Sequence, residues 1–222
     1  MEIRTEFHKK LREIQDEILA MGDMVGKALL ASVNSLKNRD LELAHKIVAD
    51  DHNINNRRFL IEEKCIELIA TQQPMAIDLR TIVAILNITT EIERIGDYAV
   101  GIARITIMIG DEPPLKPLID IPRMAEQTAD MLRRSLDAFV SRDAVEAKKI
   151  SAEDDLVDQL YDQVFRELLV FMAEDGRTIT RATRLIWAAH NLERAADRVT
   201  NICERTLFII TGKMEEIDAS KY

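Results

Sequence analysis

The chain has 222 residues, of which 47% are hydrophobic and 31% are charged, so it is long enough to bury the core of one large or two small domains. Its 39 acidic and 30 basic residues give a net charge of −9, which argues against a nucleic-acid binder and favours cations or basic protein surfaces as partners. Only 7 glycines and 5 prolines are present, too few for the many turns of a β-rich fold. An all-α fold is therefore expected.

Three long helices are predicted in the first half of the chain. Apolar residues recur every three or four positions, as on one face of a helix, and polar or proline-containing breaks separate three such stretches. The predicted helices cover residues 4–36, 41–70 and 76–109. The segment 110–117 that follows contains three of the five prolines and is the strongest linker in the sequence.

The same plan recurs in the second half, where helices are predicted over residues 122–140, 144–173 and 178–211. The pair Arg39-Asp40 returns 103 residues later, and the segment Glu93–Asp97 returns 100 residues later as Glu193–Asp197. A shared helical period does not explain these matching segments, so they indicate an internal duplication. We therefore predict two tandem three-helix bundles, residues 1–112 and 113–222, with six long helices in all.

The sequence also predicts the compartment of the protein. The N-terminal segment lacks the apolar core of a secretory signal, and no apolar run of 18 residues is present. Cys65 and Cys203 form no CxxC pair and lie within helical periodicity, so they are expected to be buried thiols. These features predict a cytoplasmic protein without a membrane-spanning helix.

Acidic residues gather on one side of the last predicted helix, beside its apolar stripe, while its arginines project elsewhere. Glu193 and Asp197 are four residues apart, a spacing at which like charges repel, and a bound cation would relieve that repulsion. Oxygen-rich clusters suit ions such as magnesium, calcium, manganese or iron. The predicted metal ligands in this half are Glu193, Asp197, Asn201, Glu204, Asp154 and Asp158. The other interpretation is a solvated acidic edge, neutralised by lysines of other helices.

The first half repeats this pattern in a weaker form. Glu93 and Asp97 repeat the acidic pair, and Asp51 stands 103 residues before Asp154. Gly101 and Arg104, however, replace the amide and the second glutamate of the other copy. Because Arg104 projects to the side of the acidic pair, it should neutralise part of its charge. The first half is therefore predicted to hold metal less well.

Four short segments carry a resemblance to a known family. They read QPMAIDLR at 73–80, EIERIGD at 91–97, NLERAAD at 191–197 and NICE at 201–204. With these segments in a duplicated three-helix chain, residues 7–212 resemble the PhoU family, whose members are regulators associated with phosphate-specific transport. The resemblance implies two similar three-helix bundles. It also implies metal clusters on E/DxxxD motifs, reported as iron or zinc and elsewhere as magnesium or manganese, at Glu93, Asp97, Glu193 and Asp197.

The resemblance further implies a regulator and not an enzyme. Proteins of this family restrain phosphate uptake by the Pst ABC transporter. They also help the PhoR sensor histidine kinase to hold the PhoB response off when phosphate is plentiful. They are cytoplasmic, often homodimeric, and peripheral to the inner membrane through protein partners.

Three functional classes remain open on the sequence. The first is the regulator described above. The second is a metal-dependent hydrolase or a metal-storage bundle, although no separate catalytic base with a known spacing is recognisable. The third is a metal-free scaffold whose acidic residues meet basic patches of its partners. The arginines at 177, 181 and 184 form a basic cluster that is interpreted as a solvated helix start in preference to a partner site.

Overall fold

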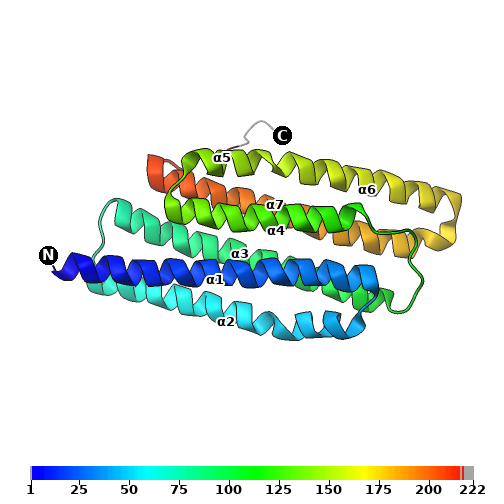
Figure 1. The fold of residues 1–222 in the computed structure, drawn as a ribbon, viewed down its shortest axis with the longest axis horizontal. Helices are drawn as coiled ribbons and strands as arrows, with labels where there is room; N and C mark the ends of the chain where they lie inside the picture. The colour runs from blue at the N-terminus through cyan, green and yellow to red at the C-terminus, as the bar shows by residue number, and fades with distance from the viewer. Residues whose placement is uncertain (1, 216, 218–222) are drawn as a thin grey trace.

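The computed structural model describes residues 2–215 and 217, and in this part of the chain it contains only helices, turns and loops (Figure 1). The elements are α1 Glu2–Asn38, α2 Leu41–Gln72, α3 Ile77–Ile109, α4 Asp120–Ser141, α5 Ala144–Ala152, α6 Asp154–Glu174, the 3-10 turn η1 Gly176–Thr178 and α7 Ile179–Thr211. The all-α prediction is confirmed, and the helices of each half follow one another as predicted.

Equivalent capping residues begin the second helix of each half. Asp40 accepts a hydrogen bond from the backbone N–H of Leu43 at 2.9 Å. Asp143, 103 residues later, accepts from the backbone N–H of Val145 at 3.0 Å and of Glu146 at 2.9 Å. An aspartate at this position satisfies donors that the first helical turn leaves without a partner. The duplication seen in the sequence therefore extends to the way in which these helices start.

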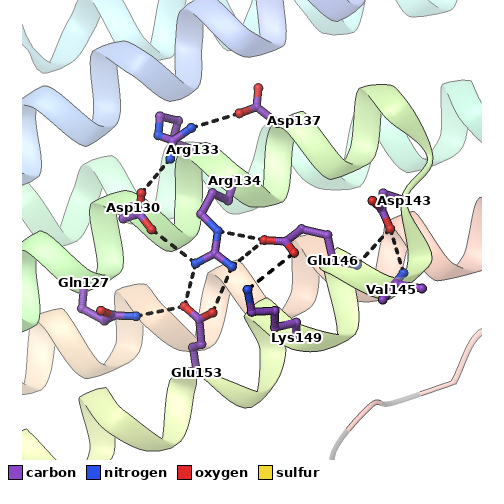
Figure 2. A network of polar contacts seen from close by, with 10 residues as sticks. All are labelled: Gln127, Asp130, Arg133, Arg134, Asp137, Asp143, Val145, Glu146, Lys149 and Glu153. Carbon is purple, nitrogen blue, oxygen red and sulfur yellow. Dashed lines mark hydrogen bonds and ion pairs between the residues drawn. The ribbon is translucent and has the colours of Figure 1, made fainter.

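The predicted helix 144–173 is wrong in one respect, because the structure divides it into α5 and α6 at Glu153. The backbone N–H of Glu153 bonds to the carbonyl of Ile150 at 3.0 Å, and that of Leu156 bonds to the carbonyl of Glu153 at 3.0 Å, so the chain tightens into three-residue turns there. Figure 2 shows that Arg134 of α4 holds the Glu153 carboxylate, with Nη1–Oε2 and Nη2–Oε1 distances of 2.8 and 2.9 Å. The apolar period of one segment cannot predict a contact of this kind with another helix.

The two halves lie side by side along their whole length (Figure 1). Contacts between them run mainly from α3 to α7 and from α1 to α4, and one continuous cluster of buried apolar residues passes through both halves. At the α1–α4 contact, a Cβ on Gly22 would lie 2.1 Å from Cδ1 of Leu136, so a larger residue there would require the Leu136 side chain to move. The shared core means that the two bundles stabilise each other, while the boundary at residues 112 and 113 stays a prediction.

Two further sequence predictions concern the core and the membrane. Cys65 and Cys203 are buried free thiols, as predicted, and burial raises the pKa of each to about 12. None of the helices described here is both long and apolar enough to cross a bilayer.

Candidate metal sites

The acidic residues of the second half gather around Glu193 of α7. The Glu193 side chain is 24% exposed, and burial, followed by the charges of Asp197, Asp158 and Asp154, raises its pKa to about 7. Asp154 and Asp158 approach from the first turns of α6, which packs along α7. Three of the other residues predicted as ligands in this half thus lie near enough to Glu193 to act on it through their charges.

Two aromatic rings, those of His190 and Tyr161, border this acidic group. The Nδ1 atom of His190 lies 3.1 Å from Oε2 of Glu193, but the two are too poorly aligned for a hydrogen bond. Tyr161 of α6 packs on the His190 ring with centroids 5.9 Å apart, and burial together with the Glu193 charge raises the pKa of Tyr161. His190 was not among the residues predicted as metal ligands. The three-residue step from His190 to Glu193 on one helix was the available signal.

Asn201 and Glu204 lie apart from the other predicted ligands of this half. Asn201 donates from Nδ2 to Oε2 of Glu91 on α3, at 3.1 Å. Glu204 accepts from the backbone N–H of Ile217 at 3.2 Å, and its other oxygen lies 3.5 Å from Nη2 of Arg205, so the expectation that every arginine of this helix faces away from the acids is wrong. Glu204 was predicted as a ligand because it falls on the same side of the helix as Glu193. It is seven residues beyond Asp197, however, which is about 10 Å along the helix axis.

The first half contains the corresponding acidic group, but guanidinium groups face it. Burial, followed by the charges of Glu93 and Asp51, raises the pKa of Asp97, while Arg104 and Arg58 oppose the increase. The Nη1 atom of Arg58 donates to Oε1 of Glu93 at 3.0 Å. Arg104 therefore acts on this group as the sequence suggested, whereas the contribution of Arg58 was missed.

The repeat alignment explains how Arg58 could have been found. Residue 58 plus the offset of 103 is Tyr161, so the position that contacts the acidic group carries an arginine in the first half and a tyrosine in the second. Arg58 is also bound to Glu62 at 2.8 Å, which fixes its guanidinium between two carboxylates. The acidic group around Glu193 thus carries the less neutralised negative charge of the two.

The acidic residues around Glu193 offer oxygen atoms, the donor type that hard cations prefer. Oε2 of Glu193 is buried without a hydrogen bond, and three aspartates act on its carboxyl group. In the positions the described side chains take, no three or more Asp, Glu, His or Cys residues are grouped closely enough to hold a metal ion.

Comparison with known proteins identifies the family. Residues 18–106 and 121–206 each match the family model described as the PhoU domain. This chain belongs to the PhoU family. It is 37% identical over 216 residues to the "Phosphate-specific transport system accessory protein PhoU homolog" of Clostridium acetobutylicum, spanning 97% of this chain and 99% of that protein. It is 35% identical over 211 residues to the "Phosphate-specific transport system accessory protein PhoU" of Escherichia coli, spanning 95% of this chain and 88% of that protein.

Solved PhoU structures share the fold. The crystal structure of PhoU from Pseudomonas aeruginosa matches with a TM-score of 0.88 and 35% identity, over 93% of this chain and all of that chain. The phosphate transport system regulatory protein PhoU from Streptococcus pneumoniae matches with a TM-score of 0.88 and 29% identity, over 94% of this chain and 99% of that chain. The paired PhoU domains confirm the duplication that the motif offsets predicted.

We predict that the metal-free protein loses stability as the pH rises from about 5 to about 8. The pKa of Glu193 is about 7 in the folded state against an ordinary value of 4.5, so between these values the folded state binds more protons than the unfolded state, and the free energy of unfolding falls with pH. Glu193→Gln should remove much of this fall, whereas Glu126→Gln, at an exposed glutamate, should not. Urea unfolding at several pH values with a chelator measures both, and equal slopes in the two variants would contradict the assignment.

A second prediction concerns the first half. Arg104→Glu combined with Arg58→Tyr should increase the metal bound there, because the two changes remove the guanidinium groups that oppose the charge of Asp97. The gain is measured by elemental analysis at fixed free metal, in a Glu193→Ala background that weakens the other site. Arg94→Glu, a charge reversal at a half-exposed arginine of α3, is the matched control. A gain of the same size in the control would show that general charge and not this site attracts the metal.

Proposed function

We propose that this protein is a cytoplasmic regulator of phosphate homeostasis. In this proposal it restrains uptake by the Pst phosphate transporter and helps a PhoR-type sensor histidine kinase to keep the PhoB response off when phosphate is plentiful. The observation that carries the proposal is the match of both halves to the PhoU domain, with full-length relatives named as accessory proteins of phosphate-specific transport.

The proposed mode of action is protein binding and not catalysis. Each half exposes apolar side chains on its outer helices, and one pair of them is equivalent by the offset of 103: Ile66 on α2, 61% exposed, and Leu169 on α6, 43% exposed. Exposed apolar side chains of this kind suit contacts with other proteins. The proposal includes a homodimer and attachment to the inner membrane through these partners.

A metal ion has a structural role in the proposal. Glu193, Asp197, Asp158 and Asp154 would hold an iron, zinc, manganese or magnesium ion, once their side chains converge on it. Such an ion supplies positive charge that offsets the repulsion among these carboxylates. Because two of them belong to α6 and two to α7, their shared ligand would fix these helices relative to each other. The group around Asp97 would hold metal less strongly.

Membrane fractionation tests the proposed attachment. Membranes from cells that lack the Pst transporter and the sensor kinase are expected to retain much less of this protein than membranes from the parent cells. Vesicles of bare lipid provide the control, because the protein should not bind to them. Retention that does not depend on the two partners would contradict the proposal, and strong binding to bare lipid would indicate a lipid-binding surface in their place.

A further inference from the structure

A basic pocket of about 260 Å³ lies where the two halves are joined. Its wall combines the turn between α1 and α2, the linker after α3 and the beginning of α7. Four basic side chains and one acidic side chain line it, namely Lys37, Arg39, Lys116, Arg181 and Glu112. The chain as a whole carries a net charge of −9, so the pocket has the opposite sign of charge to the molecule as a whole. A concave site with one sign of charge attracts ligands of the opposite sign.

Two larger grooves have a smaller excess of basic residues or none. The groove of about 620 Å³ between the helices of the first half is lined by three basic and two acidic residues. The groove of about 550 Å³ between α1 and α4 is lined by two basic and four acidic residues. The pocket at the linker is therefore the best suited of the three to an anion.

Two arginines of α7 approach Glu112 of the pocket wall: Arg181, which itself lines the pocket, and Arg184, which lies on the other oxygen of the same carboxylate. The Nε atom of Arg181 lies 3.8 Å from Oε2 of Glu112, and Nη1 of Arg184 lies 3.6 Å from Oε1 of the same carboxylate. Both distances exceed those of a hydrogen bond. The side chains of Arg181 and Arg184 are only 26% and 22% exposed, so the expectation of a solvated basic helix start is wrong for them and holds only for Arg177, which is 90% exposed.

The guanidinium group of Arg184 also has an unused donor. Its Nη1 atom is buried and makes no hydrogen bond within the described residues. A buried donor without an acceptor is costly, and the cost is greater for a charged group. Arg181, by comparison, donates from Nη1 to the carbonyl of Pro113 at 3.1 Å, which leaves its other donors toward the pocket. The two guanidinium groups thus offer donors that Glu112 does not fully satisfy.

Of the remaining basic residues of the pocket, one forms an ion pair with an acidic residue and two do not. Lys116 forms an ion pair with Glu167 of α6. Lys37 and Arg39 form no ion pair within the described part of the chain, and they belong to the end of α1 and the turn that follows it, whereas Arg181 belongs to α7. An anion in the pocket would therefore meet positive charge from both halves of the chain.

We propose that this pocket binds a small anion that bears a phosphoryl group, which takes the place of the Glu112 carboxylate between Arg181 and Arg184. The planar guanidinium group matches phosphoryl oxygens with two parallel donors. Glu112 then acts as an internal competitor, and the apolar wall made by Leu36 and Leu185 receives the body of an organic phosphate. Because both halves contribute to the wall, the ligand connects them. The site stands on its own geometry and needs neither the transporter nor the kinase.

Isothermal titration calorimetry on the full chain, treated with a chelator, tests the site with inorganic phosphate and with adenosine monophosphate at constant ionic strength. We expect saturable binding of one ligand per chain. Arg181→Ala and Arg184→Ala should each weaken it by about tenfold or more, as loss of a charge-assisted contact requires. Glu112→Gln should tighten it by about threefold, because the competing charge is removed. Phosphate binding alone identifies the free ion as the ligand, and tighter binding of the nucleotide identifies a phosphomonoester.

Two control variants separate this site from the rest of the molecule. Arg177→Ala removes an exposed arginine that is paired with Asp175, and it should leave the affinity unchanged. Glu126→Gln, at an exposed glutamate outside this pocket, should also leave it unchanged, and the chelator excludes phosphate held by a metal ion in the acidic group. Should an alanine variant fail to fold, Arg184→Lys and Glu112→Gln decide the question, since both keep a polar group in place.

The outcomes that overturn the proposal are specific. They are the absence of saturable binding of either ligand up to about 10 mM, unchanged affinity in the arginine variants, or a Glu112→Gln variant that binds no more tightly. Sulfate that binds as strongly as phosphate would show an unselective anion site and would also overturn it. None of these results bears on whether the protein restrains phosphate uptake, which is measured in cells.

Discussion

Replacement of Arg134 by methionine is expected to lower the free energy of unfolding by about 2 kcal/mol. Arg134 of α4 is 19% exposed and donates to Glu153 at 2.8 and 2.9 Å and to Glu146 at 2.9 and 2.5 Å (Figure 2). These hydrogen bonds, first to Glu153 and then to Glu146, raise the pKa of Arg134. Removal of the guanidinium leaves two partly buried carboxylates close together without their cation, which costs more than loss of an exposed pair.

Arg133→Met is the matched control for this experiment. Arg133 is the preceding residue, is 63% exposed, and pairs with Asp130 and Asp137 on the surface of α4. Its loss should cost less than about 0.5 kcal/mol, as is usual for exposed ion pairs. Urea unfolding at neutral pH measures both variants, and equal losses would show that the network around Arg134 contributes no more than a surface pair.

The first half of the chain has no arginine at the position equivalent to Arg134. By the offset of 103, Ala31, Leu43 and Asp50 occupy the positions of Arg134, Glu146 and Glu153, and all three line the groove of about 620 Å³. Asp50 thus keeps a carboxylate at the position of Glu153, whereas Ala31 and Leu43 carry neither the guanidinium group of Arg134 nor the carboxylate of Glu146. Glu146→Leu added to Arg134→Met should recover part of the lost stability, because it removes one unpaired carboxylate and adds an apolar side chain.

A large difference in metal content is expected between variants of the two acidic groups. Glu193→Gln or Asp197→Asn should remove more bound metal than Glu93→Gln or Asp97→Asn. The reason is that Arg58 already binds Glu93 at 3.0 Å and Arg104 acts on Asp97, whereas Tyr161 occupies the place of Arg58 beside Glu193. A net contribution of about 1.4 kcal/mol from these guanidinium groups would change the metal affinity tenfold.

Elemental analysis after dialysis against fixed free iron, zinc, manganese or magnesium measures this difference. The amide substitutions keep the size of each side chain, so a loss of metal reports on charge and ligand chemistry more than on packing. Equal losses from both pairs of variants would contradict the ranking. Loss of metal from neither pair would remove the metal from the proposed mechanism and leave a scaffold that acts through its surfaces alone.

The architecture was readable from the sequence because it depends on local patterns. The apolar period and the motif offsets each require only residues that are near in sequence or repeated in it. Asp40 and Asp143 show this well, since the offset of 103 pairs them and the structure shows that each caps a helix. The break at Glu153 was not readable, because its carboxylate is held by Arg134 from another helix.

The candidate site was predicted less completely, and for two physical reasons. Glu204 was predicted as a ligand because it lies on the same side of α7 as Glu193. It is eleven residues further along the helix, however, and the rise along the axis places it too far from Glu193 to share its ligand. The prediction also treated one helix at a time. Arg58 reaches the acidic group from α2, and only the comparison of position 58 with position 161 would have revealed its effect.

The most direct test of the proposed regulator is the rate of radiolabelled phosphate uptake by cells of the native organism grown with abundant phosphate. Deletion of the gene for this protein is predicted to leave uptake through the Pst transporter high under these conditions, and the unchanged chain supplied from a plasmid should return it to the low rate of the parent. An uptake rate that stays at the parental value in the deletion cells would contradict the account.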